Sequence, residues 1–353
     1  MRRTQLTLLT TLCCFSSFLF SAEECFLPSA RPEAPKGCNL FAWADWLYWQ
    51  PSETGLSYAI YNEDLDLSSD TLMGSGHVAQ PKFDWNSGIR LGLGYNLPHD
   101  QWDLTFLWTW YEGTGDGSEQ SDKKNTPAIL PSFVHPNAYN DQSIVAALSA
   151  NADISIHLNM LDLDLGKQVK LSQSVSLKPS LGLRSAWVNQ TYSIEYQNLF
   201  DKTAERVLND YRTHINNDFW GIGIFGGFSS DWSLKWGLSL FGEGDLSLLY
   251  GFFDNSYEES FVTPKGNGNI VISDTNNFHT GRVIADLTLG LRWTTLCLKE
   301  RLKVILQTGW EQHVFFSQNQ ILRFVDGQAW GSFVQNQGDL NFQGFSIGLH
   351  LYF

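Results

Sequence analysis

The stretch NSGIRLGLGYNLPHDQWDLTFLWTW (86–110) decides the fold class, because large apolar residues fill alternate positions in both of its halves. Side chains on a β-strand point to opposite faces in turn, so this spacing predicts two strands, each with one apolar face. Trp102 and Phe106 share such a face, and Asp103 lies opposite them. The connector NLPHD (96–100) is short and contains proline, which predicts a tight hairpin.

The same alternation recurs through the rest of the chain and predicts an all-β protein. Further strands are expected within residues 153–165, 175–184, 232–240, 282–293, 302–307 and 344–353, and residues 231–253 are expected to form either one long strand or a hairpin. At Met160 and Leu161 the apolar phase changes, which predicts a β-bulge. The clear and weaker segments together predict an antiparallel barrel of about 10–12 strands, which would span a membrane without an open sheet edge.

Two kinds of connector alternate between the predicted strands. The long, polar connectors cover residues 51–84, 113–150, 191–216, 254–278 and 316–340, and the short ones lie near 96–100, 166–173, 229–231 and 294–301. Bacterial outer-membrane barrels have long extracellular loops and short periplasmic turns. The alternation therefore predicts a transmembrane β-barrel with both termini in the periplasm. A soluble sandwich is the alternative, but one Trp-rich face opposite a face of Gly, Ser and charge favours the barrel.

The first residues have the features of a secretory signal peptide. Two arginines open the chain, an apolar stretch follows, and Ala22 offers a cleavage site. Residues 1–22 are predicted to be a signal peptide, residues 23–38 a periplasmic N-terminal segment and residues 39–353 the transmembrane β-barrel. A membrane anchor at the N-terminus is the alternative, but the apolar stretch is short and contains Thr and Ser.

The charge balance excludes several classes of function. The chain has 23 basic and 37 acidic residues, a net charge of −14, and removing Arg2 and Arg3 with the signal peptide makes it −16. Nucleic acid is disfavoured, since phosphate binding needs clustered basic residues.

The His residues are scattered, and GIGIFG (221–226) precedes another strand rather than the helix of a dinucleotide site. We therefore expect no metal and no cofactor.

Charged residues on the polar strand faces are candidates for the barrel interior. The predicted pore-lining residues are Arg90, Asp103, Asp153, His157, Asp162, Asp164, Lys178, Arg184, Lys235, Arg282, Asp286, Arg292, Lys303 and Glu311. Rows of opposite charge orient water in a pore and resist apolar solutes. The alternative is that these charges pair and plug a narrow barrel. Because the net negative charge then resides mainly in the loops, the sequence predicts a weak preference for cations.

One row of polar residues raises the alternative of a hydrolase. Asp153, Ser155, His157 and Asn159 share the predicted lumen side of one strand. Residues two apart on a strand are roughly 6.6 Å apart, so a nucleophile and its base would need a partner from another strand. Pore lining is the favoured interpretation, and no enzyme activity is expected.

Three cysteines remain after removal of the signal peptide, and all lie at the predicted periplasmic end. Cys25, Cys38 and Cys297 are candidates for a disulfide within the chain, or for cross-links to another copy or to other envelope proteins. Unpaired thiols are the alternative. The final residue, Phe353, follows alternating apolar positions, as in the C-terminal signal that bacterial barrels present to the outer-membrane assembly machinery.

Several stretches resemble the major-outer-membrane-protein-like porin family of Legionella and chlamydia-like bacteria. They are FAWADWLYWQPSETGLSYAI (41–60), LDLDLGK (161–167), PSLGLRSAWVNQTYSIEY (179–196) and WGIGIFGGFSSDWSLKWGLSLFGEGDLSLLYG (220–251). The likeness spans most of the mature chain and is structural, so no active-site residue carries over. It implies an abundant, pore-forming protein. The large loops do not match, so the resemblance says nothing of solute preference.

The sequence as a whole predicts an outer-membrane porin that passes small hydrophilic solutes and ions by passive diffusion. The alternative is a structural or adhesive surface protein with acidic loops, and a third interpretation is the outer-membrane enzyme. The expected partners are the lipid bilayer and the assembly machinery, with a homotrimer left open.

Overall fold

The computed structural model describes residues 39–62, 75–97, 102–122, 127–138, 145–201, 206–207, 210–263, 266–297, 302–325 and 332–353. The predicted signal peptide and periplasmic segment, with Cys25 and Cys38, lie outside these residues and stay predictions. No helix among the described residues is long and apolar enough to cross a membrane.

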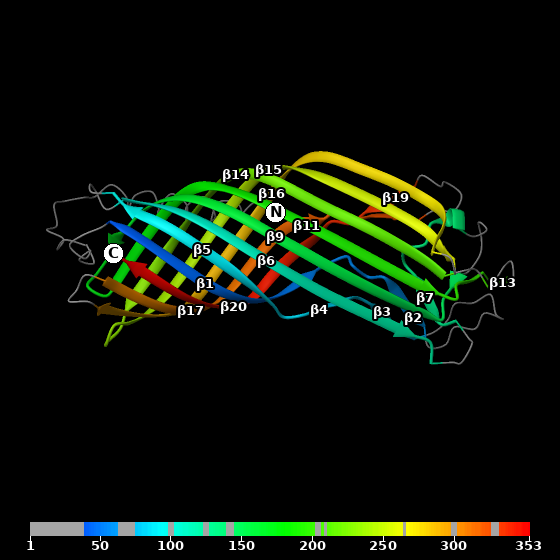
Figure 1. Ribbon diagram of the computed structural model, residues 1–353, viewed down its shortest axis with the longest axis horizontal. Coiled ribbons are helices and arrows are strands. Elements are labelled where there is room, and N and C mark those ends of the chain that lie inside the picture. Colours follow the sequence, from blue (N-terminus) through cyan, green and yellow to red (C-terminus); the bar gives the residue numbers. More distant parts are fainter. Residues whose placement is uncertain are drawn as a thin grey trace, which may run out of the picture. The chain divides into compact units, whose positions relative to one another are not determined.

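Ten antiparallel strands of the described chain pair in a closed ring, which confirms the predicted barrel and a strand number within the expected range. In ring order they are β1 (Leu40–Glu53), β5 (Asn86–Asn96), β6 (Trp102–Gln120), β9 (Ser149–Lys167), β11 (Val175–Gln197), β14 (Asp210–Ser233), β15 (Leu238–Thr263), β16 (Gly266–Cys297), β17 (Leu302–Asn319) and β20 (Gly338–Tyr352). The last strand pairs with the first, Tyr352 opposite Phe41, which closes the ring. Figure 1 shows these strands inclined to the barrel axis.

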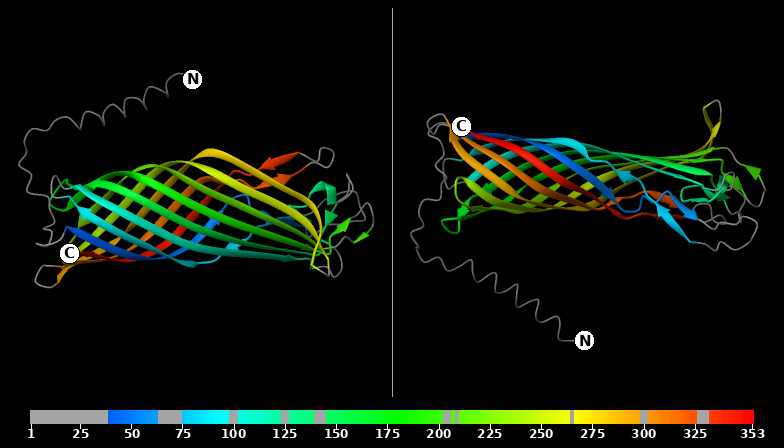
Figure 2. Two further views of the ribbon diagram at one scale, coloured as in Figure 1. Left: turned by 45° about the horizontal axis from the view of Figure 1, so that its top comes forward. Right: turned by 90° about the horizontal axis from the view of Figure 1, so that it is seen from below.

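Shorter strands extend the ring or form small sheets among the long connectors. They are β2 (Ala59–Asn62), β3 (Gly76–Ala79), β4 (Lys82–Phe83), β7 (Ile129–Pro131), β8 (Val145–Ala146), β10 (Val169–Lys170), β12 (Phe200–Asp201), β13 (Arg206–Val207), β18 (Leu322–Phe324) and β19 (Phe333–Gln335), with the 3₁₀ helix η2 (Pro136–Ala138). The sheet β3–β2–β7 joins the first and second long connectors. Figure 2 shows the short turns and the C-terminus at one end of the barrel, away from these sheets.

The ring strands run through two environments, and β9 shows the change most clearly. Its even-numbered residues face the interior along its whole length, where Ile156 and Asp162 are both buried. Its odd-numbered residues face outward, where Asp153 is exposed to solvent and Leu163 is 43 % exposed. Near the short turns the wall is therefore apolar outside and polar inside, as in a membrane. Beyond Leu161 toward the loops it is polar outside and apolar inside, as in a soluble barrel.

The predicted β-bulge at Met160 is therefore wrong. The register of β9 against both β11 and β6 continues without a shift through Met160 and Leu161. The backbone keeps pointing even-numbered residues inward and odd-numbered residues outward. The apolar residues move from even to odd positions because the outer face meets water in one half of the strand and the membrane in the other. This inversion also explains why the predicted loops 113–150, 191–216 and 254–278 contain long strand segments.

The turn between β14 and β15 corrects a second expectation. The apparent strand across residues 232–240 is a hairpin, with β14 ending at Ser233 and β15 starting at Leu238. Trp236 and Gly237 have φ of 60° and 75°. Two successive positive φ values are the geometry of a type I′ turn, which matches the twist of the flanking strands.

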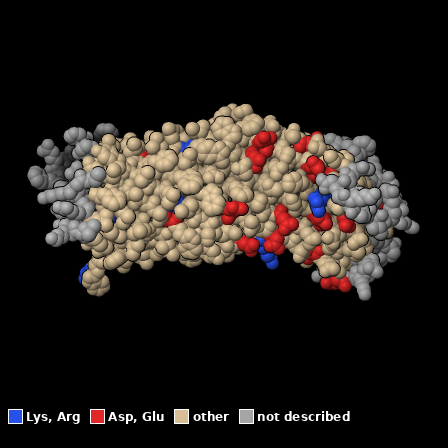
Figure 3. All heavy atoms as spheres, viewed as in Figure 1, with Lys and Arg blue, Asp and Glu red and all other residues tan. Residues whose placement is uncertain are grey.

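Exposed tryptophans mark the two boundaries of the apolar outer wall. Trp220 and Trp232 on β14 are 48 % and 53 % exposed. The twelve positions between their numbers correspond to about 40 Å along a strand at ~3.3 Å per residue. At a tilt of ~45° this is roughly 28 Å along the membrane normal, close to the apolar band of about 25 Å of outer-membrane barrels. In Figure 3 acidic residues gather over the half of the visible surface nearer the loops, and the other half is mainly uncharged.

Candidate functional site: the barrel interior and its outer wall

Buried ion pairs cross the membrane-spanning half of the interior. Arg184 on β11 donates to both carboxylate oxygens of Asp162 on neighbouring β9, at 2.8 and 3.0 Å. It also pairs with Asp286 on β16, three positions away around the ring. Arg184 is 4 % exposed, so this guanidinium depends on its carboxylate partners rather than on water.

The same network continues to the opposite wall. His313 on β17 contacts Asp286 at 2.7 Å and Glu311 at 3.2 Å. Glu311 accepts two hydrogen bonds from Arg90 on β5, at 2.9 and 2.8 Å. Arg90 also lies 3.6 Å from Asp45 on β1. Side chains from six strands thus form one chain of charges across the lumen.

Further pairs lie nearer the short turns. Lys178 lies 2.6 Å from Asp103, and Arg292 lies 2.6 Å from Asp231 and 3.4 Å from Glu243. Lys178 and Asp103 come from β11 and β6, which flank β9 in the ring. Paired charges of this kind satisfy one another within the protein, as polar groups must in a narrow lumen.

Aromatic side chains fill the interior above the ion pairs. Trp49 on β1 has its ring 5.4 Å from that of Tyr111 on β6 and 6.0 Å from that of Phe342 on β20. Phe342 in turn packs edge-on against Phe315 on β17, at 5.7 Å. All four are at most 2 % exposed. The first long connector enters the same layer, because Tyr192 on β11 donates to the carbonyl of Leu56 at 2.8 Å.

A buried carboxylate near the loops is held by tyrosines. Glu259 on β15 is completely buried and accepts hydrogen bonds from the hydroxyls of Tyr211 and Tyr257 and from the backbone N–H of His135 at 2.6 Å. Burial nevertheless raises the pKa of Glu259 above its ordinary value, because desolvation of the charged form outweighs these hydrogen bonds. Burial also raises the pKa of Tyr257 well above its ordinary range.

The structure brings most of the predicted lining residues into the interior. The ion-pair groups contain Arg90, Asp103, Asp162, Lys178, Arg184, Asp286, Arg292 and Glu311. Arg282 lies over the ring of buried Phe253 at 4.9 Å, and Lys303 over that of Tyr352 at 5.1 Å. Asp164 is partly buried beside Lys178 and Asp103.

Three predicted lining residues lie elsewhere. Asp153 and His157 face outward on the polar part of β9, where the apolar residues between them point inward. His157 lies 3.1 Å from Glu112, and both side chains are nearly half exposed. Lys235 lies in the exposed turn between β14 and β15. The first two were misplaced because the environment inverts along β9, and the third because a hairpin was taken for a strand.

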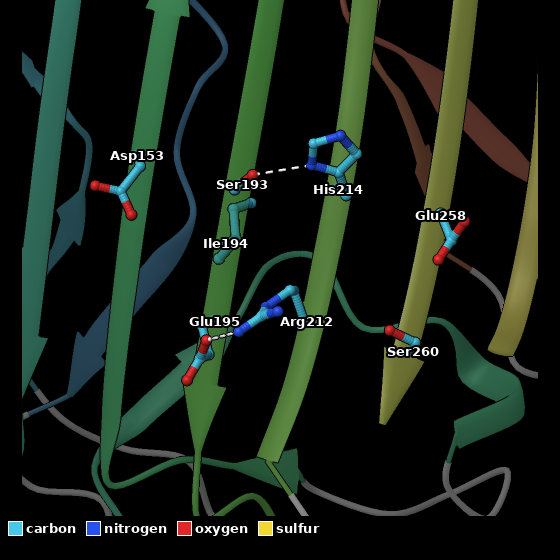
Figure 4. Close-up of a pocket in the computed structure, with 8 residues that line it drawn as sticks. All are labelled: Asp153, Ser193, Ile194, Glu195, Arg212, His214, Glu258 and Ser260. Atoms are coloured by element: carbon cyan, nitrogen blue, oxygen red, sulfur yellow. Dashed lines mark hydrogen bonds and ion pairs between the residues drawn. The ribbon is translucent and has the colours of Figure 1, made fainter. Parts of the chain in front are cut away.

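A hollow on the outer wall gathers the polar residues of four neighbouring strands. It has a volume of about 410 Å³ and is lined by Asp153, Ser193, Ile194, Glu195, Arg212, His214, Glu258 and Ser260. Figure 4 shows Ser193 pointing to His214 and Glu195 pointing to Arg212. The hydroxyl of Ser193 lies 2.9 Å from Nδ1 of His214, and Glu195 lies 2.6 Å from Arg212.

This serine–histidine pair replaces the predicted 153–159 row as the lead for a hydrolase. Glu258 is in register with His214 on the next strand and would be the third member. Acyl transfer also needs N–H donors aimed at the developing oxyanion. Ser193 lies in the middle of a three-strand ladder, in which backbone N–H groups bond the neighbouring strands. The backbone N–H groups beside Ser193 are thus engaged in the sheet, and among the described residues no cluster of His, Cys, Asp and Glu could hold a metal.

Sequence reasoning missed several interior residues. Asp45 and His313 belong to the charge network but were not predicted as lining. For His313 a signal existed, since it lies two residues after Glu311 on the same face. Cys297, at the end of β16, is exposed and forms no disulfide with a described residue, and because Cys25 and Cys38 lie outside the described residues the predicted cross-links stay a prediction.

The closed ring, its apolar outer wall and its tryptophan boundaries define an outer-membrane β-barrel. The family model described as the Legionella pneumophila major outer membrane protein precursor matches residues 32–353, and the chain belongs to that family. The predicted resemblance and the outer-membrane location are thereby confirmed.

Solved structures with a similar fold are distant in sequence. The outer membrane protease OmpT of Escherichia coli is 12% identical, with 89% of this chain and 96% of that chain covered and a TM-score of 0.44. A major outer membrane protein of Thermus thermophilus is 10% identical, with 88% and 99% covered and a TM-score of 0.32. A FadL homologue of Pseudomonas aeruginosa is 9% identical, with 89% and 90% covered and a TM-score of 0.29. No curated relative matches the sequence.

Proposed function

We propose that this barrel is sealed in the state described and serves as a rigid outer-membrane support that presents an acidic wall at the cell surface. The observation that carries the proposal is that two stacked layers of buried side chains occupy the interior, the ion pairs that connect Arg184 on β11 to Asp286 on β16 and the aromatic layer around Trp49. Both layers consist mainly of side chains of the ring strands, so loop movement alone does not remove them.

The outer wall supports the presentation role. Above the tryptophan boundary it carries Glu112, Asp153, Glu195 and Glu258, with Arg212 as a basic neighbour of the last three. A wall of this charge suits a basic partner, because opposite charges steer and orient encounter. The serine–histidine pair is assigned no reaction.

A porin is the second candidate, and the polar membrane-spanning half favours it. Balanced charges such as Arg90 and Glu311 line that half and could orient water once the aromatic layer is displaced. In this candidate the acidic surface gives the pore its weak cation preference.

Conductance of the refolded mature protein in planar bilayers separates the two candidates. A sealed barrel produces no conductance steps, whereas stepwise conductance in the wild-type protein would overturn the proposal and support the porin.

The presentation role is tested by binding of protein-bearing liposomes to a polylysine surface. Binding should weaken with salt and in a variant with Glu112, Asp153, Glu195 and Glu258 neutralised. Equal binding of that variant would contradict the role.

A further inference from the structure

A group of amides and one carboxylate is buried inside the half of the barrel that holds the aromatic layer. Its members are Glu53 on β1, Gln190 on β11, Asn217 on β14, Asn255 on β15 and Gln318 on β17. None is more than 9 % exposed, and Gln318 is 1 % exposed. Five strands thus direct polar side chains to one place in an apolar layer, where each needs a polar partner.

Hydrogen bonds join the side chains of Glu53, Gln190 and Asn217 to one another and to the backbone of Gln318. The amide of Gln190 donates to Oε2 of Glu53 at 2.6 Å, and that of Asn217 donates to Oε1 of Gln190 at 2.6 Å. Asn217 also donates to the carbonyl of Gln318 at 3.1 Å. Asn255 is directly opposite Asn217 in the register of β14 and β15. Hydrogen bonds thus connect β1, β11, β14 and β17, while Asn255 on β15 is placed beside Asn217 by the strand register, and its amide donates to the backbone carbonyl of Gln320 at 3.4 Å.

The cluster has more acceptors than donors. Among the described residues, buried oxygens without a hydrogen-bond partner include Oε1 of Glu53, Oδ1 of Asn217, Oδ1 of Asn255 and Oε1 of Gln318. The only donor of these side chains left without a partner is Nε2 of Gln318, again within the described part of the chain. Glu53 forms no ion pair with any described Lys or Arg. Burial therefore raises the pKa of Glu53 to about 8, because its charged form has neither a cation nor enough donors, and a bound cation would take the place of the proton.

We propose that the oxygens of Glu53, Asn217, Asn255 and Gln318 bind a monovalent hard cation, with Na⁺ as the fitting ion. Carboxylate and amide oxygens are the ligands that hard cations prefer. One carboxylate balances one positive charge, whereas a divalent ion would leave a net charge in an apolar layer. The site belongs to the state in which the aromatic layer fills the interior, and binding of Na⁺ there requires no conduction.

The test compares unfolding of the refolded mature protein in detergent in NaCl and in choline chloride at equal ionic strength. A cation that binds only the folded state stabilises it by mass action, so above the dissociation constant each tenfold rise in Na⁺ should raise the folded-to-unfolded ratio about tenfold. Choline is too large for the site and should have no such effect. Equal unfolding in the two salts overturns the proposal, and stabilisation by Ca²⁺ alone overturns the monovalent assignment.

Variants connect the effect to the cluster. Glu53→Gln and Asn255→Leu should abolish the difference between Na⁺ and choline. Glu259→Gln is the matched control, because Glu259 is also buried in the same half but has its hydrogen bonds from Tyr211, Tyr257 and His135. Retention of the Na⁺ effect in Glu53→Gln would overturn the proposal. If the variants do not refold, ²³Na NMR of the wild-type protein is the deciding measurement. Broadening of the ²³Na signal in the presence of the protein supports the site, and an unbroadened signal overturns the proposal.

Discussion

Ile156 is completely buried and Leu163 is 43 % exposed, although both are large aliphatic residues of strand β9. The two point to opposite faces of the same wall. Ile156 packs in the aromatic interior near the loops, and Leu163 faces the membrane near the turns. The two residues show that the interior is polar in the membrane-spanning half of the barrel and apolar in the half near the loops.

Alanine substitutions at these two positions should have unequal costs. Ile156→Ala leaves a cavity in a packed layer and is expected to lower the free energy of unfolding by about 2–5 kcal/mol. Leu163→Ala should cost less, because lipid or detergent fills the space. Urea unfolding followed by tryptophan fluorescence measures both. Equal losses would show that the interior near the loops is not packed.

The cross-lumen network predicts a large effect of Arg184→Ala. Removal of one member of a buried ion pair costs about 3–5 kcal/mol, because its partners Asp162 and Asp286 are left uncompensated. Arg212→Ala is the matched control, since its pair with Glu195 lies on the outer surface, with side chains 44 % and 28 % exposed, and surface pairs are worth about 0–1 kcal/mol. The heat-induced mobility shift on gels compares the variants, and similar shifts would contradict the network's role.

The buried carboxyl of Glu259 predicts a pH dependence of stability. Its pKa is raised by burial, so the unfolded state releases the proton more readily than the folded state. The resulting stabilisation is fully present below the unfolded pKa of about 4.3 and is lost as pH rises through the folded pKa. Melting temperatures measured from about pH 4 to about pH 9 should therefore fall with pH. Glu259→Gln should flatten this part of the profile, and an unchanged slope would refute the assignment.

The hairpin between β14 and β15 requires glycine at position 237. Gly237 has φ of +75°, and a Cβ there would lie 2.4 Å from the carbonyl oxygen of Thr294. Gly237→Ala should destabilise the barrel by about 1–3 kcal/mol, the usual cost of a strained backbone position. Gly226→Ala is the control, because a Cβ at that position would meet its nearest atom at 3.7 Å. A harmless Gly237→Ala would contradict the turn geometry.

Cys297 allows a test of topology and pairing. It is exposed at the end of β16 beside a short turn, which the predicted orientation places in the periplasm. A large maleimide that cannot cross the outer membrane should label it only after permeabilisation. Labelling of Cys297 in intact cells would show that the predicted orientation is wrong.

Reducing and non-reducing gels that differ would support the predicted disulfide cross-links of Cys25, Cys38 and Cys297.

The sequence predicted the membrane-spanning half well, because there the alternation of residues such as Leu91 and Arg90 follows the rule of apolar outside and polar inside. The half near the loops obeys the same period with the opposite rule, and a single sequence does not reveal which medium a strand face meets. Asp153 and His157 were misplaced for that reason. The cluster around Glu53 could not be predicted, since its five members come from strands distant in the sequence.

The uninterrupted alternation through Met160 and Leu161 constrains how such strands can change in length. Insertion of one residue there would exchange inside and outside for one half of β9, placing Asp162 against lipid or Ile156 against water. Insertion of two residues would keep every side chain on its face and only lengthen the wall. Length variation among relatives at this point of β9 should therefore occur in even steps.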